Sequence, residues 1–287
     1  MIPKKHHSQI NRLITQALQE DVGRGDITTQ LLVSKKQISK AALVVRENAV
    51  IFGLEIVRRV FQKLDRNIRM QINYHDGQSV PANSVVAILE GKTHALLTAE
   101  RVALNFFSRL SGIATLTSRY VQAIRPFTTK IFDTRKTTPT LRILERLAVH
   151  AAGGGNHRFN LNDMILIKDN HRVACQSKIS LQKIITHAKK KTKRPIEIEV
   201  DSLEDLEVAL LSKPDFILLD NMSASQLRAA VRLKKTLRIS GKPFLEASGG
   251  VTLKNIQTIA QTGIDRISVG ALTHSPQAVN VALEFLS

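Results

Sequence analysis

Short apolar segments and helical segments alternate from residue 130 to the end of the chain, with few breaks. Buried strands that alternate with helices form parallel sheets whose helices cover the outside. About six or seven strands are visible, so we expect an incomplete βα barrel rather than the usual eight strands. The strand candidates are Ile131–Asp133, Met164–Lys168, Ile196–Val200, Phe216–Asp220, Phe244–Ala247 and Arg266–Gly270.

Helix-start signals stand between these strands. Ser202 and Ser223 each precede a helical segment, and each has a side chain three residues later that can complete a capping box. Thr138 followed by Pro139 fits the N-cap and the first helical position. These signals agree with helices that connect successive strands of a barrel.

The first ninety residues mix strands and helices without this alternation, which predicts an α+β domain of sandwich-like form. Two helices are expected next, Leu96–Leu110 and Ile113–Ile124, with a break at Gly112. We therefore place the α+β domain at residues 1–112 and the barrel at residues 113–275. The last segment, 276–287, is predicted to be a helix that packs back on the first domain. The other expected elements are helices Ile10–Glu20 and Leu54–Leu64 and strands Ala41–Arg46, Val50–Gly53, Ile68–Tyr74 and Val85–Glu90.

A polar residue closes almost every strand of the predicted barrel. The carboxyl ends of barrel strands meet at one mouth, which is where barrel enzymes hold their active sites. A single charged residue at a strand end is usually a cap, but a ring of them indicates a site. The residues of this ring are Asp133, Arg135, Lys168, Glu199, Asp220, Glu246, Ser248, Gly249, Gly250 and Gly270.

The residue types in and near the ring indicate an anionic, phosphorylated ligand. Cations suit carboxylate and phosphate oxygens, and arginine binds them two at a time. Glu199 and Asp220 suit sugar hydroxyls or Mg²⁺, often held through water. The loops at Gly249-Gly250 and Gly270-Ala271 follow the last two strands, a common place for a phosphate site in barrels. The basic set is Arg135, Lys136, His157, Arg158 and Lys168, with Arg101 as a possible sixth.

The charge balance raises the question of nucleic acid. The chain has 42 Lys and Arg against 24 Asp and Glu, a net charge of +18. We interpret runs such as 189–194 as solvated faces, and few aromatics interleave with them, so nucleic-acid binding is unlikely. The single cysteine, Cys175, excludes an intrachain disulfide. The N-terminus has no apolar signal region and no window approaches a membrane span, so a cytoplasmic protein is expected.

Three motifs occur in order: DTRKTTP at 133–139, GGGNHR at 153–158 and LIKDNH at 166–171. Together they resemble quinolinate phosphoribosyltransferase, also called nicotinate-nucleotide pyrophosphorylase (carboxylating), of the type II phosphoribosyltransferases. EDVGRGDIT at 20–28 and TAERVALN at 98–105 extend the resemblance, which covers Glu20 to Ser275. One departure is Thr140, where the family is expected to have glycine and where we expect a structural effect at most.

The resemblance implies phosphoribosyl transfer from phosphoribosyl pyrophosphate to quinolinate with loss of CO₂, which gives nicotinate mononucleotide for NAD biosynthesis. It implies Mg²⁺, no organic cofactor and a homodimer. Spacing alone favours a solvent face for Arg101, whereas the resemblance implies that Arg101 reaches the partner's active site. Arg101, Arg135, His157, Arg158 and Lys168 are then expected to clamp the substrate carboxylates. The other expected substrate ligands are Lys136, Glu199, Asp220, Ser248, Gly249, Gly250, Gly270 and Ala271, with Lys136, Lys168, Glu199 and Asp220 in catalytic roles and Glu199 and Asp220 near the metal.

Three alternatives stay open at this point. A phosphoribosyltransferase for another pyridine base would share most of these motifs. An aldolase-like barrel could use Lys168 as a Schiff-base lysine, although it would not need so many cations. A nucleic-acid-binding protein would explain the charge but not the ring at the strand ends.

Overall fold

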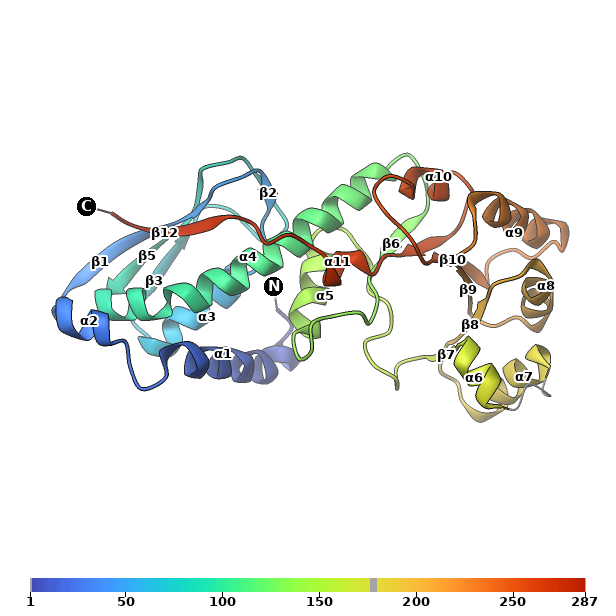
Figure 1. Cartoon of the computed structure of the whole chain (residues 1–287), viewed down its shortest axis with the longest axis horizontal. Coiled ribbons are helices and arrows are strands. Elements are labelled where there is room, and N and C mark those ends of the chain that lie inside the picture. Colours follow the sequence, from blue (N-terminus) through green and yellow to red (C-terminus); the bar gives the residue numbers. More distant parts are fainter. Residues whose placement is uncertain (1, 176–179, 287) are drawn as a thin grey trace. The chain divides into compact units, whose positions relative to one another are not determined.

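The computed structural model describes residues 2–175 and 180–286 (Figure 1). The chain forms two compact units. The first comprises Met1–Ser118, Thr137–Gly153 and Ser275–Ser287, and the second comprises Arg119–Lys136 and Gly154–His274. The predicted division lies at residue 112, whereas the first unit runs to Ser118 and also includes Thr137–Gly153. Among the described residues, none of the helices combines the length and hydrophobicity that a membrane span requires.

The first unit is built on an antiparallel sheet with strand order β12-β1-β5-β3. Its helices bury apolar stripes at helical spacing; in α1, for example, Ile10, Ile14 and Leu18 are buried. The sheet strands are β1 (Ile38–Val45), β3 (Arg69–Ile72), β5 (Ser84–Lys92) and β12 (Val281–Leu286), and β2 (Ala49–Val50) pairs with β4 (Ser79–Val80). The helices include a short 3₁₀ turn at Lys4–His6, then α1 (His7–Val22), α2 (Ile27–Leu32), α3 (Leu54–Leu64), α4 (Thr93–Ala123) and α5 (Arg142–Ala151).

The predicted C-terminal helix is wrong, because the segment forms the strand β12. It pairs antiparallel with β1, from Lys40 opposite Leu286 to Val45 opposite Val281. Apolar residues at 281, 283 and 285 follow the two-residue period of a strand. The open edge of β1 supplies the hydrogen-bond partners that this pattern needs. The segment therefore does join the N-terminal domain, but as a sheet strand.

The predicted break at Gly112 is also wrong, since α4 runs without interruption from Thr93 to Ala123. Gly112 has another role: a Cβ at this position would collide with the backbone of Gln277. The glycine lets the C-terminal segment approach the helix closely. A glycine inside a helix costs up to about 1 kcal/mol relative to alanine, and this close approach is the compensation.

The helix predicted to start at Thr138 starts instead at Arg142, with Leu141 as its N-cap. Thr138 is held outside the helix by the buried carboxylate of Glu145, which accepts from its backbone nitrogen at 3.1 Å and from its hydroxyl at 2.8 Å. Thr140, which lies between Thr138 and Glu145 in the chain, adopts a left-handed backbone conformation with φ of 69°. This conformation suits glycine and is strained for a β-branched residue.

Replacing Thr140 with glycine is therefore expected to raise the free energy of unfolding by roughly 0.5–1 kcal/mol. The left-handed conformation costs an L-residue about 1–2 kcal/mol, and the freer unfolded chain of glycine takes back part of that gain. Thermal or urea unfolding measures the change, with Thr140→Ala as the control that keeps a Cβ and should stabilise less. A loss of stability in the glycine variant would contradict the strain argument.

The second unit contains six parallel strands in the order β6-β11-β10-β9-β8-β7 (Figure 1). The first strand pairs with the last, so the sheet curls as a barrel does, whereas β6 and β7 are not paired as strands and leave it open. The incomplete βα barrel is thus confirmed. Its strands are β6 (Lys130–Phe132), β7 (Ile165–Ile167), β8 (Ile196–Val200), β9 (Phe216–Asp220), β10 (Phe244–Ser248) and β11 (Arg266–Ser268).

Helices connect these strands, and two predicted caps are present. Ser202 accepts from the backbone nitrogen of Asp205 at 3.2 Å, and Ser223 forms a full capping box with Gln226. The helices of this unit are α6 (Asp169–Ala174), α7 (Leu181–Lys191), α8 (Leu203–Ser212), α9 (Ala224–Thr236), α10 (Ile256–Ala260) and α11 (Ala271–His274).

Candidate active site

A cavity of about 850 Å³ opens at the carboxyl ends of the barrel strands. Every site residue predicted from the sequence lines it except two: Asp133, which is buried beside the cavity, and Arg101, which is exposed on α4 in the first unit. The predicted residues that line the cavity are Arg135, Lys136, His157, Arg158, Lys168, Glu199, Asp220, Ser248, Gly249, Gly250, Gly270 and Ala271, together with Glu246.

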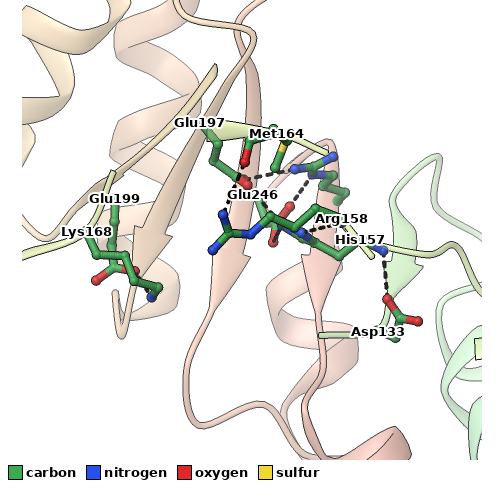
Figure 2. Close-up of polar contacts among 9 residues, drawn as sticks. Asp133, His157, Arg158, Met164, Lys168, Glu197, Glu199 and Glu246 are labelled. Carbon is green, nitrogen blue, oxygen red and sulfur yellow. Dashed lines mark hydrogen bonds and ion pairs between the residues drawn. The ribbon is translucent and has the colours of Figure 1, made fainter. Parts of the chain in front are cut away.

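The two arginines of the cavity lie close enough to affect each other's charge. Burial, and then the charge of Arg135, lower the pKa of Arg158 below its ordinary value. The Arg158 guanidinium donates to the backbone carbonyl of Met164 at 3.1 Å, which fixes part of its path (Figure 2). Two guanidiniums held beside one cavity repel each other, and a bound anion relieves that repulsion.

Asp133 lies at the end of β6 but does not line the cavity, although the sequence placed it in the ring. Its carboxylate is fully buried and accepts from the backbone nitrogen of His157 at 2.7 Å and from the side-chain amide of Asn156 at 2.8 Å. Figure 2 shows the contact with His157. Asp133 therefore ties the loop that carries His157 and Arg158 to the end of the strand.

A buried cluster of charges extends from His157 into the barrel. The Nε2 atom of His157 lies 2.9 Å from Glu197 and 3.5 Å from Glu246 (Figure 2). Arg266 is paired with both carboxylates, at 2.8 Å from Glu197 and closer still to Glu246. The Arg266 guanidinium also stacks on the ring of Phe216, 3.7 Å from its centroid. We call His157, Glu197, Glu246 and Arg266 the buried quartet.

The sequence interpretation missed Glu197 and Arg266. A signal was present in IEIEV, because residues two apart on a strand share a face, so Glu197 points the same way as Glu199. A fully buried carboxylate on a strand needs a cation or hydrogen-bond donors beside it. Arg266, at the start of a barrel strand, supplies it.

The pKa values of the two carboxylates in the buried quartet are shifted in opposite directions. Burial and the neighbouring Glu197 raise the pKa of Glu246 to about 7. Burial alone would raise the pKa of Glu197 too, but His157 and Arg266 bring it below its ordinary value. Ligand atoms of His157, Glu197 and Glu246 lie within 4.8 Å of one another, as in a metal site. In this structure the positive charge beside both carboxylates comes from Arg266.

Glu199 and Asp220 end neighbouring strands, β8 and β9, and both line the cavity. Glu199 is paired with Lys168 at 2.5 Å, and Asp220 accepts from the side-chain amide of Asn221 at 2.8 Å. Two carboxylates on adjacent strand ends are hard oxygen donors of the kind that Mg²⁺ prefers, so this pair fits a metal held through water.

The ion pair between Lys168 and Glu199 also bears on the aldolase alternative. A Schiff-base lysine must lose its proton before it can attack a carbonyl. The Lys168 side chain is 44% exposed and is paired with a carboxylate, whereas such a lysine is activated by an apolar pocket or a cationic neighbour. The geometry therefore favours Lys168 as an anion ligand.

The glycine loops shape the other side of the cavity. Gly249 and Gly250 have φ of 89° and 58°, a left-handed conformation that turns the backbone after β10. A Cβ on Gly249 would collide with the side chain of Asn221, while the space beside Gly250 is open. Gly270, after β11, comes close to Lys136 and His274. Backbone N–H groups at such turns suit a phosphate.

Two family models match nearly the whole chain. The model of the quinolinate phosphoribosyl transferase N-terminal domain matches residues 26–111, and that of the C-terminal domain matches residues 113–284. The chain belongs to the quinolinate phosphoribosyltransferase family.

Curated members of the family support this assignment. The chain is 43% identical to a probable nicotinate-nucleotide pyrophosphorylase (carboxylating) of Synechocystis, over 93% of this chain and 90% of that protein. It is 38% identical to the probable enzyme of the same name from Bacillus subtilis, over 97% of this chain and 94% of that protein. The structure of the nicotinate-nucleotide pyrophosphorylase from Francisella tularensis is similar, with a TM-score of 0.92 at 38% identity, and the match covers 100% of this chain and 98% of that one.

Proposed function

We propose that this protein transfers the phosphoribosyl group of phosphoribosyl pyrophosphate to quinolinate and releases CO₂ and pyrophosphate. The product is nicotinate mononucleotide, a precursor of NAD. The observation that carries this proposal is the cavity itself, where four cations, two glycine loops and the carboxylates of Glu199, Asp220 and Glu246 line one barrel mouth. The cations are Arg135, Lys136, Arg158 and Lys168.

Binding comes first in this mechanism. Quinolinate has two adjacent carboxylates, and two arginine forks with one lysine supply enough donors for both. Arg135, Arg158 and Lys168 hold the pyridine so that its ring nitrogen faces the ribose. Lys136 assists with the phosphorylated substrate. Holding both reactants in one geometry removes much of the entropic part of the barrier.

The transfer step follows. The ring nitrogen forms a bond to C1 of the ribose while the bond from C1 to pyrophosphate breaks, and positive charge develops on the sugar. Glu199 and Asp220 face this region and stabilise that charge. Glu199 and Asp220 would hold a Mg²⁺ ion that arrives with phosphoribosyl pyrophosphate, and the ion would supply positive charge against the leaving pyrophosphate.

Decarboxylation completes the reaction. Once alkylated, the ring nitrogen is a cation, and the ring accepts the electron pair of the breaking bond to the adjacent carboxylate. The carboxylate leaves as CO₂, and the ring carbon then takes up a proton. The pyridinium is itself the electron sink, so no organic cofactor is needed in this scheme.

A direct assay tests the proposal. The protein is incubated with phosphoribosyl pyrophosphate, Mg²⁺ and either quinolinate or nicotinate, and nicotinate mononucleotide is quantified. We expect nicotinate mononucleotide to form with quinolinate and not with nicotinate. Turnover of nicotinate in its place would mean that the second carboxylate is not recognised and would favour another pyridine base.

Arg101 is proposed to serve the cavity of a second copy in a homodimer. It is exposed on α4 and is absent from the lining of the cavity in its own chain. Arginine is suited to reach a carboxylate across an interface, because its planar fork binds two oxygens at once.

Mixing two inactive variants tests this arrangement. Arg101→Ala and Lys168→Ala should each be inactive alone, yet their mixture should recover about a quarter of the wild-type activity, since half of the dimers are mixed and each has one intact site. A mixture of Lys168→Ala with Asp220→Asn is the matched control and should recover nothing, because both residues line the cavity of the same chain. Equal behaviour of the two mixtures would contradict a shared site.

A further inference from the structure

His157 uses both of its ring nitrogens inside the protein. Nδ1 accepts from the backbone nitrogen of Arg158 at 2.8 Å, and Nε2 faces Glu197 at 2.9 Å. The neutral imidazole therefore carries its proton on Nε2. The residue is only 9% exposed. This arrangement leaves the ring without an N–H directed at a ligand, although the ring forms part of the cavity wall.

The rest of the buried quartet is arranged to hold this ring. Glu197 is on β8, Glu246 on β10 and Arg266 on β11, and both carboxylates are fully buried. The Arg266 guanidinium pairs with both carboxylates and so connects the three barrel strands β8, β10 and β11 inside the barrel. Loss of one member of such a buried cluster leaves the opposite charge uncompensated, so each member is expected to depend on the others.

The peptide that follows His157 receives the effect of this anchor. Asp133 fixes the backbone nitrogen of His157, and the imidazole fixes the backbone nitrogen of Arg158. The Arg158 guanidinium is held in turn by the carbonyl of Met164. The direction in which Arg158 enters the cavity is thus set by contacts on both sides of one peptide bond (Figure 2).

We propose that Glu197, Glu246 and Arg266 are positioning residues that act through His157 to orient Arg158 toward a carboxylate of the substrate. In this role His157 connects the buried carboxylates and Arg266 to the backbone of Arg158 and does not itself bind the anion. The proposal rests on the function proposed above and adds the residues that determine how the second carboxylate is recognised.

Protonation of His157 should disturb the link. A proton on Nδ1 would face the N–H of Arg158 and break that hydrogen bond. Burial lowers the pKa of His157, and so does the charge of Arg266. The hydrogen bond and charge of Glu197, together with the charge of Glu246, outweigh both and raise the pKa above its ordinary value. Two further charged residues contact or adjoin the His157 backbone: Asp133 accepts from its nitrogen, and Arg158 follows it in the chain and is close enough to Arg135 to be affected by its charge. Quinolinate binding should therefore weaken as pH falls through this raised pKa.

Glu197→Gln tests the proposal by separating the two substrates. The KM for quinolinate should rise about tenfold or more, while the KM for phosphoribosyl pyrophosphate stays within about twofold, and the acid limb of the quinolinate profile should move to lower pH. Asp215→Asn is the matched control, because Asp215 accepts from the backbone nitrogen of Ile196, the neighbour of Glu197 at the start of the same strand, and does not line the cavity, so both KM values should stay unchanged. Equal changes in both KM values, or an unmoved acid limb, would overturn the positioning role.

A second pair of variants does not depend on the folding of the first. The side-chain oxygen of asparagine occupies about the place of Nδ1, whereas that of glutamine reaches the place of Nε2. His157→Asn should therefore keep the quinolinate KM within about threefold, and His157→Gln should raise it about tenfold. Equal losses would mean that His157 contacts the substrate directly. Failure of the wild-type protein to use quinolinate would instead overturn the proposed function, so the two failures are distinguishable.

Discussion

Replacing Arg158 with alanine is expected to raise the KM for quinolinate about 100-fold, with a KM for phosphoribosyl pyrophosphate that changes only a few-fold. The loss removes a charge-assisted fork from a half-buried site, where such hydrogen bonds contribute about 1.5–3 kcal/mol each. The proximity of Arg135 strengthens this expectation, because a pair of arginines held beside one cavity is suited to an anion with two carboxylates. Steady-state kinetics with each substrate varied in turn measures the effect.

Arg172→Ala is the matched control for this variant. Arg172 is an arginine of the same unit, paired with Asp205 at 2.7 Å, and it does not line the cavity. Its removal should leave both KM values within about twofold, as expected for a partly exposed ion pair. An Arg158→Ala protein with an unchanged quinolinate KM would show that the substrate carboxylates bind elsewhere.

Replacing Asp220 with asparagine is expected to lower kcat by about 10²–10³-fold while the quinolinate KM changes little. The substitution keeps the size of the side chain but removes the negative charge that we propose to face the ribose as it becomes positive. Preformed charges opposite a developing charge contribute on that scale when one is removed. Single-turnover kinetics at saturating substrates measures the chemical step itself.

Asp215→Asn again provides the comparison, since Asp215 directly precedes β9 and Asp220 is its last residue. Asp215 is paired with Lys242 at 2.6 Å, at the end of the barrel opposite the mouth. A comparable fall in kcat for both variants would mean that the strand is merely distorted, and an unaffected Asp220→Asn protein would remove this carboxylate from the mechanism.

Much of the barrel could be predicted because its signals are local. Phe216–Asp220 is an apolar run that ends in a carboxylate, Ile196–Val200 alternates apolar and charged residues, and the structure has strands with these bounds. The cations and glycines of the mouth follow strand ends directly, so their approach to one cavity required only the barrel topology.

The errors concern contacts between residues far apart in sequence. The strand β12 depends on the free edge of β1, more than two hundred residues earlier, and the unbroken α4 depends on the path of Gln277 past Gly112. Likewise Thr138 is drawn out of α5 by Glu145. Local propensity does not contain these partners, and tertiary contacts overrode it in each case.

The same reason explains the incomplete prediction of the site. Glu197 was visible as a charge inside a strand, but its meaning depended on Arg266 and on the loop of His157, which meet it only when the barrel curls. Asp133 was placed in the ring by its position after a strand, yet its buried carboxylate binds the loop that carries His157. Side-chain direction at a strand end is set by packing that the sequence does not reveal.

The most direct test of the proposed reaction is a labelling experiment. The protein is given phosphoribosyl pyrophosphate, Mg²⁺ and quinolinate that carries ¹³C only in the carboxylate beside the ring nitrogen. The reaction proposed here predicts that all of the label leaves as CO₂, with one unlabelled nicotinate mononucleotide formed for each CO₂ released. Label retained in a nucleotide product, or CO₂ released without that nucleotide, would contradict it.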